Sequence, residues 1–323
     1  YVISLPKEWI KKNNLQKGET IYFEENDSGS LIISSKNNNK REEKRVIEFN
    51  IDGMTERQIE LEIIANYMKD FSKIIIKGNE ISKRDKEIRN ILDRLVAIEV
   101  IEQTKDKIVA KDFLNLEEIK LPDLRNRLDT VVRSMIIDSK IGEGKENYES
   151  VNHRDYDANK FFYIILRVIR RGFEKPSVRK ALGLSLLDLS LEQHAILTIE
   201  RIGDRAKRIA REDSKSNLTK KEIGELNKIY SVIFDNYKNA MTAYKNKDYK
   251  LACKTFSENK RITSECDKIS SIMKSPRTNK IVHLLREMSQ KVSELGEVGF
   301  MSTESTISKE YYEQDVEQTQ AGP

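Results

Sequence analysis

Two acidic residues in the second half of the chain have a spacing that could serve chemistry. Glu200 and Asp204 lie four positions apart. On a helix, this spacing places both carboxylates on one face, one turn apart, where they repel each other unless a cation or an arginine lies between them. The pair therefore predicts either a cation site or an ordinary lattice of ion pairs with Arg201 and Arg205. Gly203, between the two acids, would allow another helix to approach closely.

Other residues with catalytic potential are not arranged in known patterns. His153, His194 and His283 are scattered and form no HxxxH or HExxH spacing, and Cys253 and Cys266 form no CxxC pair. The sequence contains no GxxxxGK[ST] or GxGxxG run of the kind that binds nucleotide phosphates. We therefore expect that the protein is not an enzyme.

The composition indicates which elements must position these residues. The 323 residues include only 13 Gly and 5 Pro, with 34% charged residues, and this mixture favours long, charged helices. The net charge of +5 is small, so any surface that binds nucleic acid must be local. The two cysteines, the lack of a long apolar run and the absence of a basic leader predict a cytoplasmic protein without membrane insertion. Because the chain does not begin with Met, we expect further residues before Tyr1.

The first region, residues 1–45, has the pattern of a small β structure that carries a basic helical turn. Its basic residues are Lys7, Lys11 and Lys12, which directly follow Pro6. Proline is common at the first position of a helix because it has no N–H to leave unsatisfied. The expected elements are strands at residues 1–5, 20–24 and 31–34, a short helix from Pro6, and a polar linker at 36–44.

Two runs in this region match a known pattern. Ile3-Ser4-Leu5-Pro6-Lys7-Glu8-Trp9 is followed by Leu15-Gln16-Lys17-Gly18-Glu19. These runs resemble the core of the swapped-hairpin AbrB/MazE/SpoVT family, I-x-L/I-P-K/R-E and then L-x-x-G-D/E. The resemblance implies a homodimer, because two chains interleave hairpins that bury little alone. It also implies DNA binding, with Lys7, Lys11 and Lys12 as phosphate contacts, although the hairpin could serve dimerisation alone.

The second region, residues 46–118, alternates between strand and helix patterns and predicts a small α/β module. Ser82 is the expected N-cap of its second helix, since serine side chains accept hydrogen bonds from the first helical N–H groups. No residue of the module has an evident catalytic role. The expected strands lie at residues 46–51, 73–77, 98–103 and 107–111, and the expected helices are 55–71 and a helix from Ser82.

The third region is helical and predicts two three-helix bundles, at residues 119–213 and 214–305, that arose by duplication. A polar, acidic tail at residues 306–323 is expected to be disordered. Apolar stripes at helical spacing would pack each bundle together. The expected helices are 121–141, 148–171 and 179–212 in the first bundle, and 218–246, 249–273 and 279–301 in the second.

Two segments of the first bundle match a second known pattern. The run 200–204, Glu-Arg-Ile-Gly-Asp, is similar to the signature of PhoU phosphate-uptake regulators, in which the acids coordinate metal. The segment 154–163, followed by Arg167, resembles another PhoU segment and provides Asp155 and Asn159 on one helix face. The resemblance implies a site for a divalent ion, such as Fe, Zn or Mg, in the first bundle. The implied metal ligands are Asp155, Asn159, Glu200 and Asp204.

The corresponding positions of the second bundle do not support a metal site. Arg286 and Gln290 stand where the first bundle has Glu200 and Asp204. The companion helix offers Thr263 and Asp267, so only one acid remains among these four positions of the second bundle. We therefore expect no metal ion there.

Together these features resemble an archaeal-type PhoU regulator with an N-terminal AbrB-like domain. The implied fold is mainly α, with a swapped-hairpin β domain, a small α/β module and two three-helix bundles. The implied function is negative regulation of phosphate uptake and signalling, through promoter DNA, through docking to the phosphate transporter ATPase or signalling proteins, or both. Two alternatives remain: a helical adaptor that is dimerised by its hairpin, and a metal-dependent hydrolase, which would need an additional base.

Overall fold

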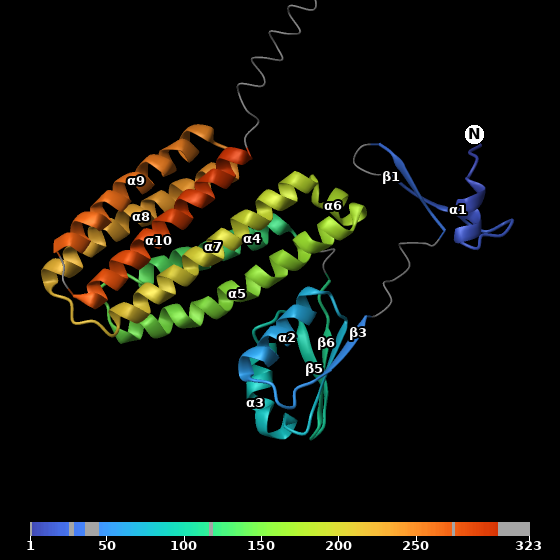
Figure 1. Cartoon of the computed structure of the whole chain (residues 1–323), viewed down its shortest axis with the longest axis horizontal. Helices are drawn as coiled ribbons and strands as arrows, with labels where there is room; N and C mark the ends of the chain where they lie inside the picture. Colours follow the sequence, from blue (N-terminus) through green and yellow to red (C-terminus); the bar gives the residue numbers. More distant parts are fainter. Residues whose placement is uncertain (1, 26–28, 36–44, 116–118, 273–274, 303–323) are drawn as a thin grey trace, which may run out of the picture. The chain divides into compact units, whose positions relative to one another are not determined.

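The computed structural model describes residues 2–25, 29–35, 45–115, 119–272 and 275–302 of the chain. The chain divides into two compact units (Figure 1). The α/β unit contains residues 1–92, 97–114 and 171–185, and the helical unit contains the remainder. The predicted linker at 36–44 and the predicted disordered tail at 306–323 lie outside the described residues.

The N-terminal segment is a short helix followed by an antiparallel hairpin. Helix α1 (Lys7–Lys12) precedes strand β1 (Tyr22–Glu25), which pairs with β2 (Leu31–Ser34). The strand that we predicted at residues 1–5 is wrong for the described residues 2–5, which have no strand structure. A strand is held by backbone hydrogen bonds to a neighbouring strand, and in this sheet β1 and β2 pair with each other. An alternating pattern alone therefore does not form a strand here.

The α/β module is a mixed sheet covered by two helices. The strand order is β3-β4-β6-β5, with β3 parallel to β4 and the other neighbouring strands antiparallel. Alternate residues such as Ile74, Ile76 and Ile108 are fully buried, as are Ile59 and Ile88 on the helices that contact β4 and β6. This alternation confirms the strand and helix patterns of the sequence. The elements are β3 (Val46–Asn50), α2 (Glu56–Met68), β4 (Lys73–Lys77), α3 (Ile81–Leu92), β5 (Ile98–Gln103) and β6 (Lys107–Asp112).

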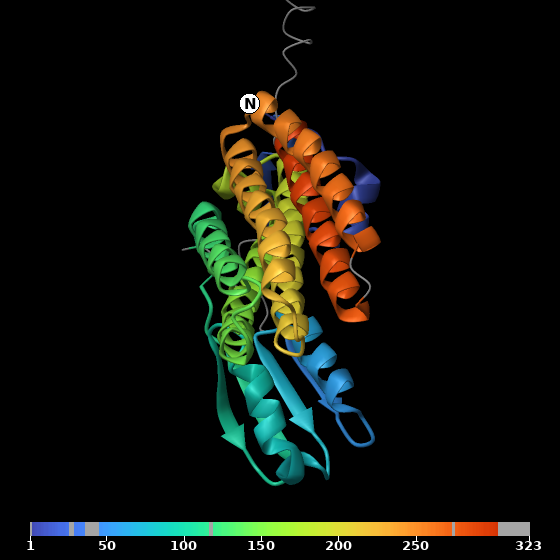
Figure 2. The ribbon, with the colours of Figure 1, turned by 90° about the vertical axis from the view of Figure 1, so that its left-hand side faces the viewer.

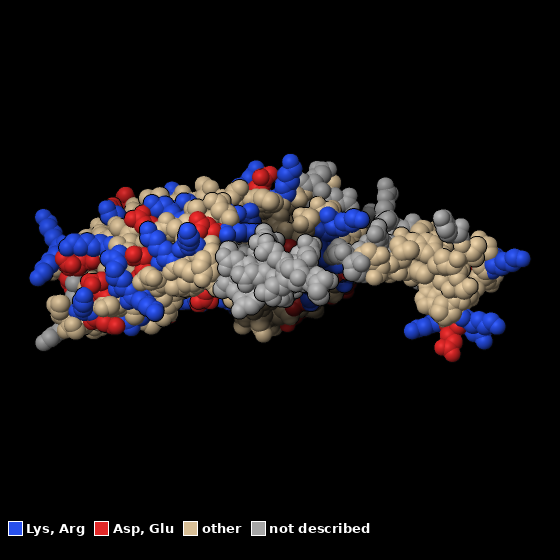
Figure 3. Space-filling view, turned by 90° about the horizontal axis from the view of Figure 1, so that it is seen from above, with Lys and Arg blue, Asp and Glu red and all other residues tan. Residues whose placement is uncertain are grey.

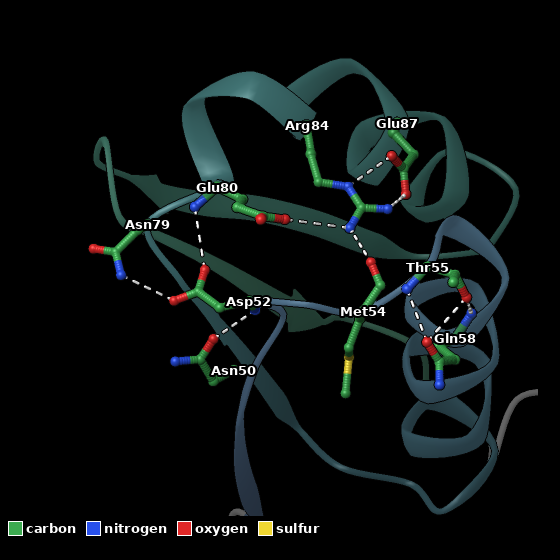
Figure 4. A network of polar contacts seen from close by, with 9 residues as sticks. All are labelled: Asn50, Asp52, Met54, Thr55, Gln58, Asn79, Glu80, Arg84 and Glu87. Carbon is green, nitrogen blue, oxygen red and sulfur yellow. Dashed lines mark hydrogen bonds and ion pairs between the residues drawn. The ribbon is translucent and has the colours of Figure 1, made fainter.

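Hydrogen bonds tie together the loops that follow β3 and β4 (Figure 4). The Asp52 carboxylate accepts hydrogen bonds from Asn79 Nδ2 at 3.0 Å and from the Glu80 N–H at 3.2 Å. The Arg84 guanidinium donates to the carbonyl oxygen of Met54, in the loop before α2. Because both loops sit at the carboxyl ends of parallel strands, these contacts fix one edge of the module.

The start of α3 differs from the prediction at its N-cap. The helix begins at Ile81, so Ser82 lies inside it rather than before it. The Ser82 hydroxyl donates a hydrogen bond to the carbonyl oxygen of Lys105 at 2.8 Å, in the β5–β6 turn. A tertiary contact has therefore replaced the local cap that the serine predicted.

The helical unit contains long helices that match the predicted ones with one exception. The predicted helix 179–212 is interrupted at Gly183, whose φ of +65° lies in the left-handed region that ends helices. The short helix α6 (Pro176–Leu182) and the end of α5 (Lys145–Glu174) belong to the α/β unit. The long helices are α4 (Leu121–Asp138), α5 (Lys145–Glu174), α7 (Leu186–Asp213), α8 (Lys220–Asn246), α9 (Tyr249–Ile272) and α10 (Pro276–Met301).

The long helices pack as two sets, which we call the first set (α4, α5 and α7) and the second set (α8, α9 and α10). In the second set all three helices pack against one another, and α10 also packs along α7 (Figures 1 and 2). In the first set α4 packs against α7, and polar side chains of α5 contact both. Within the described residues, no helix is long and apolar enough to cross a membrane.

A row of tyrosines on α8 joins the two sets. Tyr230, Tyr237 and Tyr244 are seven residues apart, which places them along one face of the helix, and all three are buried. The Tyr237 hydroxyl donates to Asp129 Oδ1 of α4 at 3.0 Å, and the Tyr244 hydroxyl donates to the Glu192 carboxylate of α7. These hydrogen bonds cross the boundary between the sets, so the boundary is a specific polar interface as well as an apolar one.

Candidate nucleic-acid interface and acidic cluster

The predicted DNA contacts lie on the exposed surface of α1. Lys7 and Lys11 are one turn apart on the same side of this helix, Lys12 follows directly, and all three are exposed. Figure 3 shows lysine side chains extending from the N-terminal segment, at the right of the view. The side-chain amide of Asn13 donates to the Trp9 carbonyl oxygen at 2.8 Å and so ends the helix. Three ammonium groups on so short an element could contact neighbouring phosphates of a nucleic acid backbone.

The helix is tied to the hairpin by its last residues. The Ser35 hydroxyl donates to Asn13 Oδ1 at 3.0 Å, which connects the end of β2 with the end of α1. Leu15 N–H donates to the Ile10 carbonyl oxygen at 3.1 Å, a helix-terminating contact that turns the chain toward β1. The lysines are therefore presented by a helix that two contacts hold to its surroundings.

The same segment exposes apolar side chains that a stable domain would bury. Val2 is 97% exposed and Leu31 is 62% exposed, and Ile3, Phe23 and Ile32 are exposed as well. Among the described residues of this segment none is buried. An isolated two-stranded hairpin is marginally stable at best, because it has no core. These exposed apolar side chains therefore favour binding to a second protein surface that would cover them.

The predicted metal ligands gather in the first set, with one addition that the sequence analysis missed. Asp155 of α5 lies next to Lys207 of α7, whose Nζ is 2.5 Å from Asp155 Oδ2. The same ammonium is 3.5 Å from Asp204 Oδ1. Asn159 Nδ2 donates to Asp155 Oδ2 at 3.3 Å, and the Glu200 carboxyl is close enough for the charges of Asp155 and Asp204 to act on it. We call Asp155, Glu200, Asp204 and Lys207 the acidic cluster.

The pKa values of the acidic cluster follow from its burial and its mixture of charges. Burial, followed by the charges of Asp204 and Asp155, raises the pKa of Glu200 to about 7. Burial also raises the pKa of Asp155, although the hydrogen bond and charge of Lys207 oppose that rise. Burial lowers the pKa of Lys207, but the two aspartates outweigh it and raise the pKa overall. The cluster therefore favours an ammonium between its aspartates.

The donor set fits a tethered ammonium better than a divalent ion. Within the described residues there is no group of three or more His, Cys, Asp or Glu side chains arranged to hold a metal ion. Lys207 Nζ and Asn159 Nδ2 both donate hydrogen bonds to Asp155 Oδ2, so this oxygen already has two donors. A divalent ion at this site stays a prediction. To bind there, the ion would have to displace the ammonium of Lys207.

The second set has a simpler arrangement at the corresponding positions. Arg286 of α10 forms an ion pair with Asp267 of α9. The Thr263 hydroxyl donates to the backbone carbonyl oxygen of Asn259 at 2.9 Å, and Gln290 is exposed. An arginine and one acid therefore take the place of the acidic cluster in this set.

A signal for Lys207 was present in the sequence. Lys207 lies three residues after Asp204 and seven after Glu200, so it shares their helix face. The spacing also offers Arg201 and Arg205 as ion-pair partners, and these two, not Lys207, were the predicted ones. In the structure Arg205 pairs instead with Glu287 of α10, at 2.7 Å.

Comparison with known proteins supports the N-terminal part of the sequence analysis. Residues 1–41 match a family model described as antidote-toxin recognition MazE, bacterial antitoxin. No curated protein and no solved structure matches the chain. The fold and this match define the class: an N-terminal MazE/AbrB-like antitoxin domain followed by a large helical region. Domains of this kind bind DNA and often dimerise, which agrees with the exposed lysines and the coreless hairpin.

Proposed function

We propose that this chain is a dimeric DNA-binding regulator whose N-terminal segment contacts DNA and whose helical region binds a partner. The observation that carries the proposal is the MazE match over residues 1–41, in which Lys7, Lys11 and Lys12 are exposed on one short helix. Lysines contact phosphates without reading bases, so these residues supply affinity and orientation. A second copy of the chain would duplicate the lysines and cover Val2 and Leu31.

A DNA titration tests this proposal directly. Fluorescence anisotropy with the protein's own upstream promoter DNA, at two salt concentrations, should show binding that weakens as salt rises. Replacing Lys7, Lys11 and Lys12 by Ala should weaken binding at least about tenfold and reduce its salt dependence. A matched control replaces the exposed Lys220, Lys221 and Lys250 of the helical unit, which removes the same charge elsewhere. Equal loss in the two triple variants, or no preference over random DNA, would leave only dimerisation for the hairpin.

The finer part of the proposal is that the regulated process is phosphate uptake. Its support is the similarity of residues 200–204 to the PhoU signature, together with the paired sets of three helices. On this proposal the protein has no catalytic step, and the helical region docks to the phosphate transporter ATPase or a signalling protein. Deleting the gene should then raise phosphate uptake in phosphate-rich medium. Complementation with the variant that lacks Lys7, Lys11 and Lys12 would separate control through DNA from control through docking.

A further inference from the structure

Lys207 occupies the centre of the acidic cluster. Its ammonium contacts Asp155 Oδ2 at 2.5 Å and lies 3.5 Å from Asp204 Oδ1, so it touches carboxylates on both helices. Asp155 is only 8% exposed, and a buried carboxylate is costly without a cation or hydrogen-bond donors. The lysine supplies both a charge and donors, as a divalent ion would supply a charge.

We infer that Lys207 is the resident cation of this cluster and stands in place of the divalent ion that the carboxylates predict. A cation on the same chain is always present at the site, whereas a dissolved ion must be captured from solution. To bind between Asp155 and Asp204, an ion would have to displace the ammonium and leave the lysine without its partners. The helices of the first set therefore stay packed together in the native protein without a metal ion.

The second set supports this inference independently. There Arg286 contacts Asp267 at the corresponding place, so a basic side chain again neutralises the acid that faces it across two helices. The two sets carry the basic side chain at different positions. In the second set it is Arg286, whereas the corresponding position of the first set holds Glu200. The first set has its basic side chain at Lys207, two turns further along α7. One solution, a tethered cation between neighbouring helices, thus occurs in both sets.

The inference leads to a gain of function on removal of the lysine. Lys207→Met keeps a long apolar stem but removes the ammonium that contacts Asp155 and lies near Asp204. Asp155 and Asp204 then lack the ammonium that lies between them, and carboxylate oxygens are ligands that hard or borderline divalent ions accept. The variant should therefore bind Mn²⁺ where the native protein does not.

Calorimetric titration of the full chain with Mn²⁺ tests the inference, and it does not depend on the proposed function. The native protein should show no saturable binding below about 1 mM, while Lys207→Met should bind one ion at least about tenfold more tightly. Adding Glu200→Gln and Asp204→Asn to Lys207→Met should abolish that binding. Lys254→Met, which removes an exposed lysine of α9, should behave as the native protein does.

Two results would overturn the inference. The first is saturable Mn²⁺ binding by the native protein that Glu200→Gln together with Asp204→Asn removes, because the ion would then have a site despite the lysine. The second is a folded Lys207→Met variant that binds Mn²⁺ no better than the native protein does. Lys207→Ala serves as a second variant if the Met substitution does not fold, and the native titration decides the matter by itself if neither variant folds.

Discussion

In each of the two helical sets a basic side chain neutralises an acid on a neighbouring helix, but the two acids differ in their exposure to water. In the first set Lys207 faces Asp155, whose side chain is 11% exposed, and two further acids lie nearby. In the second set Arg286 faces Asp267, whose side chain is 64% exposed. A buried acid depends on its cation, whereas an exposed one is served largely by water. The ion pairs at corresponding positions of the two sets therefore do not contribute equally to the free energy of unfolding. A substitution in the acidic cluster should destabilise the protein more than one in the second set.

The largest effect should come from the interface that joins the sets. Asp129 is 4% exposed and accepts hydrogen bonds from Arg133 Nε at 2.8 Å, Lys245 Nζ at 2.8 Å and the Tyr237 hydroxyl at 3.0 Å. Burial raises its pKa, but Arg133 and Lys245 outweigh burial and hold the pKa below its ordinary value. Asp129→Ala leaves these donors unpaired and should reduce the free energy of unfolding by about 3–5 kcal/mol.

Urea unfolding followed by circular dichroism measures that loss. If the two sets depend on each other, the helical unit should keep one transition that moves to lower urea. Asp235→Ala is the matched control, because Asp235 pairs with Lys238 on the exposed surface and should cost less than about 1 kcal/mol. Two separated transitions within the helical unit, apart from any transition of the α/β unit, would mean that the sets are independent and that Asp129 does not join them.

The next effect contrasts the two basic residues directly. Lys207→Met leaves buried Asp155 without its closest donor and should cost about 1–3 kcal/mol in metal-free buffer. Arg286→Met leaves Asp267 in contact with water and should cost less than about 1 kcal/mol. Thermal unfolding of both variants with EDTA present measures the difference. Equal losses would remove the distinction between the two sets.

The glycines of the central helices provide a third contrast, this time in packing. A Cβ on Gly296 of α10 would lie 2.0 Å from Thr255 Oγ1, and Thr255 is fully buried. A Cβ on Gly203 of α7 would meet Val132 Cγ2 at 3.3 Å, a distance that a small adjustment relieves. Alanine gains about 1 kcal/mol of helix propensity over glycine, while overpacking costs about 1–3 kcal/mol.

Gly296→Ala should therefore lower the free energy of unfolding by about 1–2 kcal/mol, and Gly203→Ala should leave it nearly unchanged. Urea unfolding of the two variants beside the native protein is the measurement. A stabilised Gly296→Ala variant would show that α9 and α10 can separate enough to accept a methyl group.

Much of the fold and part of the acidic cluster could be predicted from the sequence. The apolar periodicity predicted the long helices and the module's strands, because burial on one face leaves a regular pattern. The spacing of Glu200 and Asp204 and the PhoU-like segments predicted that both would meet Asp155, and the structure brings these acids together. Lys207 shares the helix face of these acids, but the spacing offers Arg201 and Arg205 as partners as well, so the sequence alone did not single out the lysine.

The remaining differences between prediction and structure come from one helix end and from tertiary contacts. Gly183 was read as part of a continuous helix, yet its positive φ ends α6 and separates that helix from α7. Ser82 was assigned to a local cap, but its hydroxyl binds a carbonyl oxygen in the β5–β6 turn. The tyrosines of α8 repeat every seven residues, a signal that was present but not used. The Ser82 and tyrosine cases involve partners distant in the sequence, whereas the Gly183 case involves a local backbone conformation.

The smallest effect should be a pH dependence confined to the first set. Because the pKa of Glu200 is raised from 4.5 to about 7, the folded protein holds this proton more tightly than the unfolded chain does. The resulting stabilisation is complete below about pH 4.5 and largely present near pH 5, and it is lost as the pH rises to about 7, where the buried carboxylate ionises.

Glu200→Gln keeps the shape of the side chain without the charge. It should therefore be more stable than the native protein by about 1 kcal/mol at pH 8, with the advantage disappearing near pH 5. Glu287→Gln is the comparison for the second set, and it should show no such gain, because Glu287 pairs with Arg205 and the substitution removes that contact. Urea midpoints of both variants at pH 5, 6, 7 and 8 measure the trend. A stability advantage of Glu200→Gln that does not change between pH 5 and pH 8 would mean that Lys207 keeps Glu200 ionised over this whole range. The pKa of Glu200 in the folded protein would then not be raised to about 7.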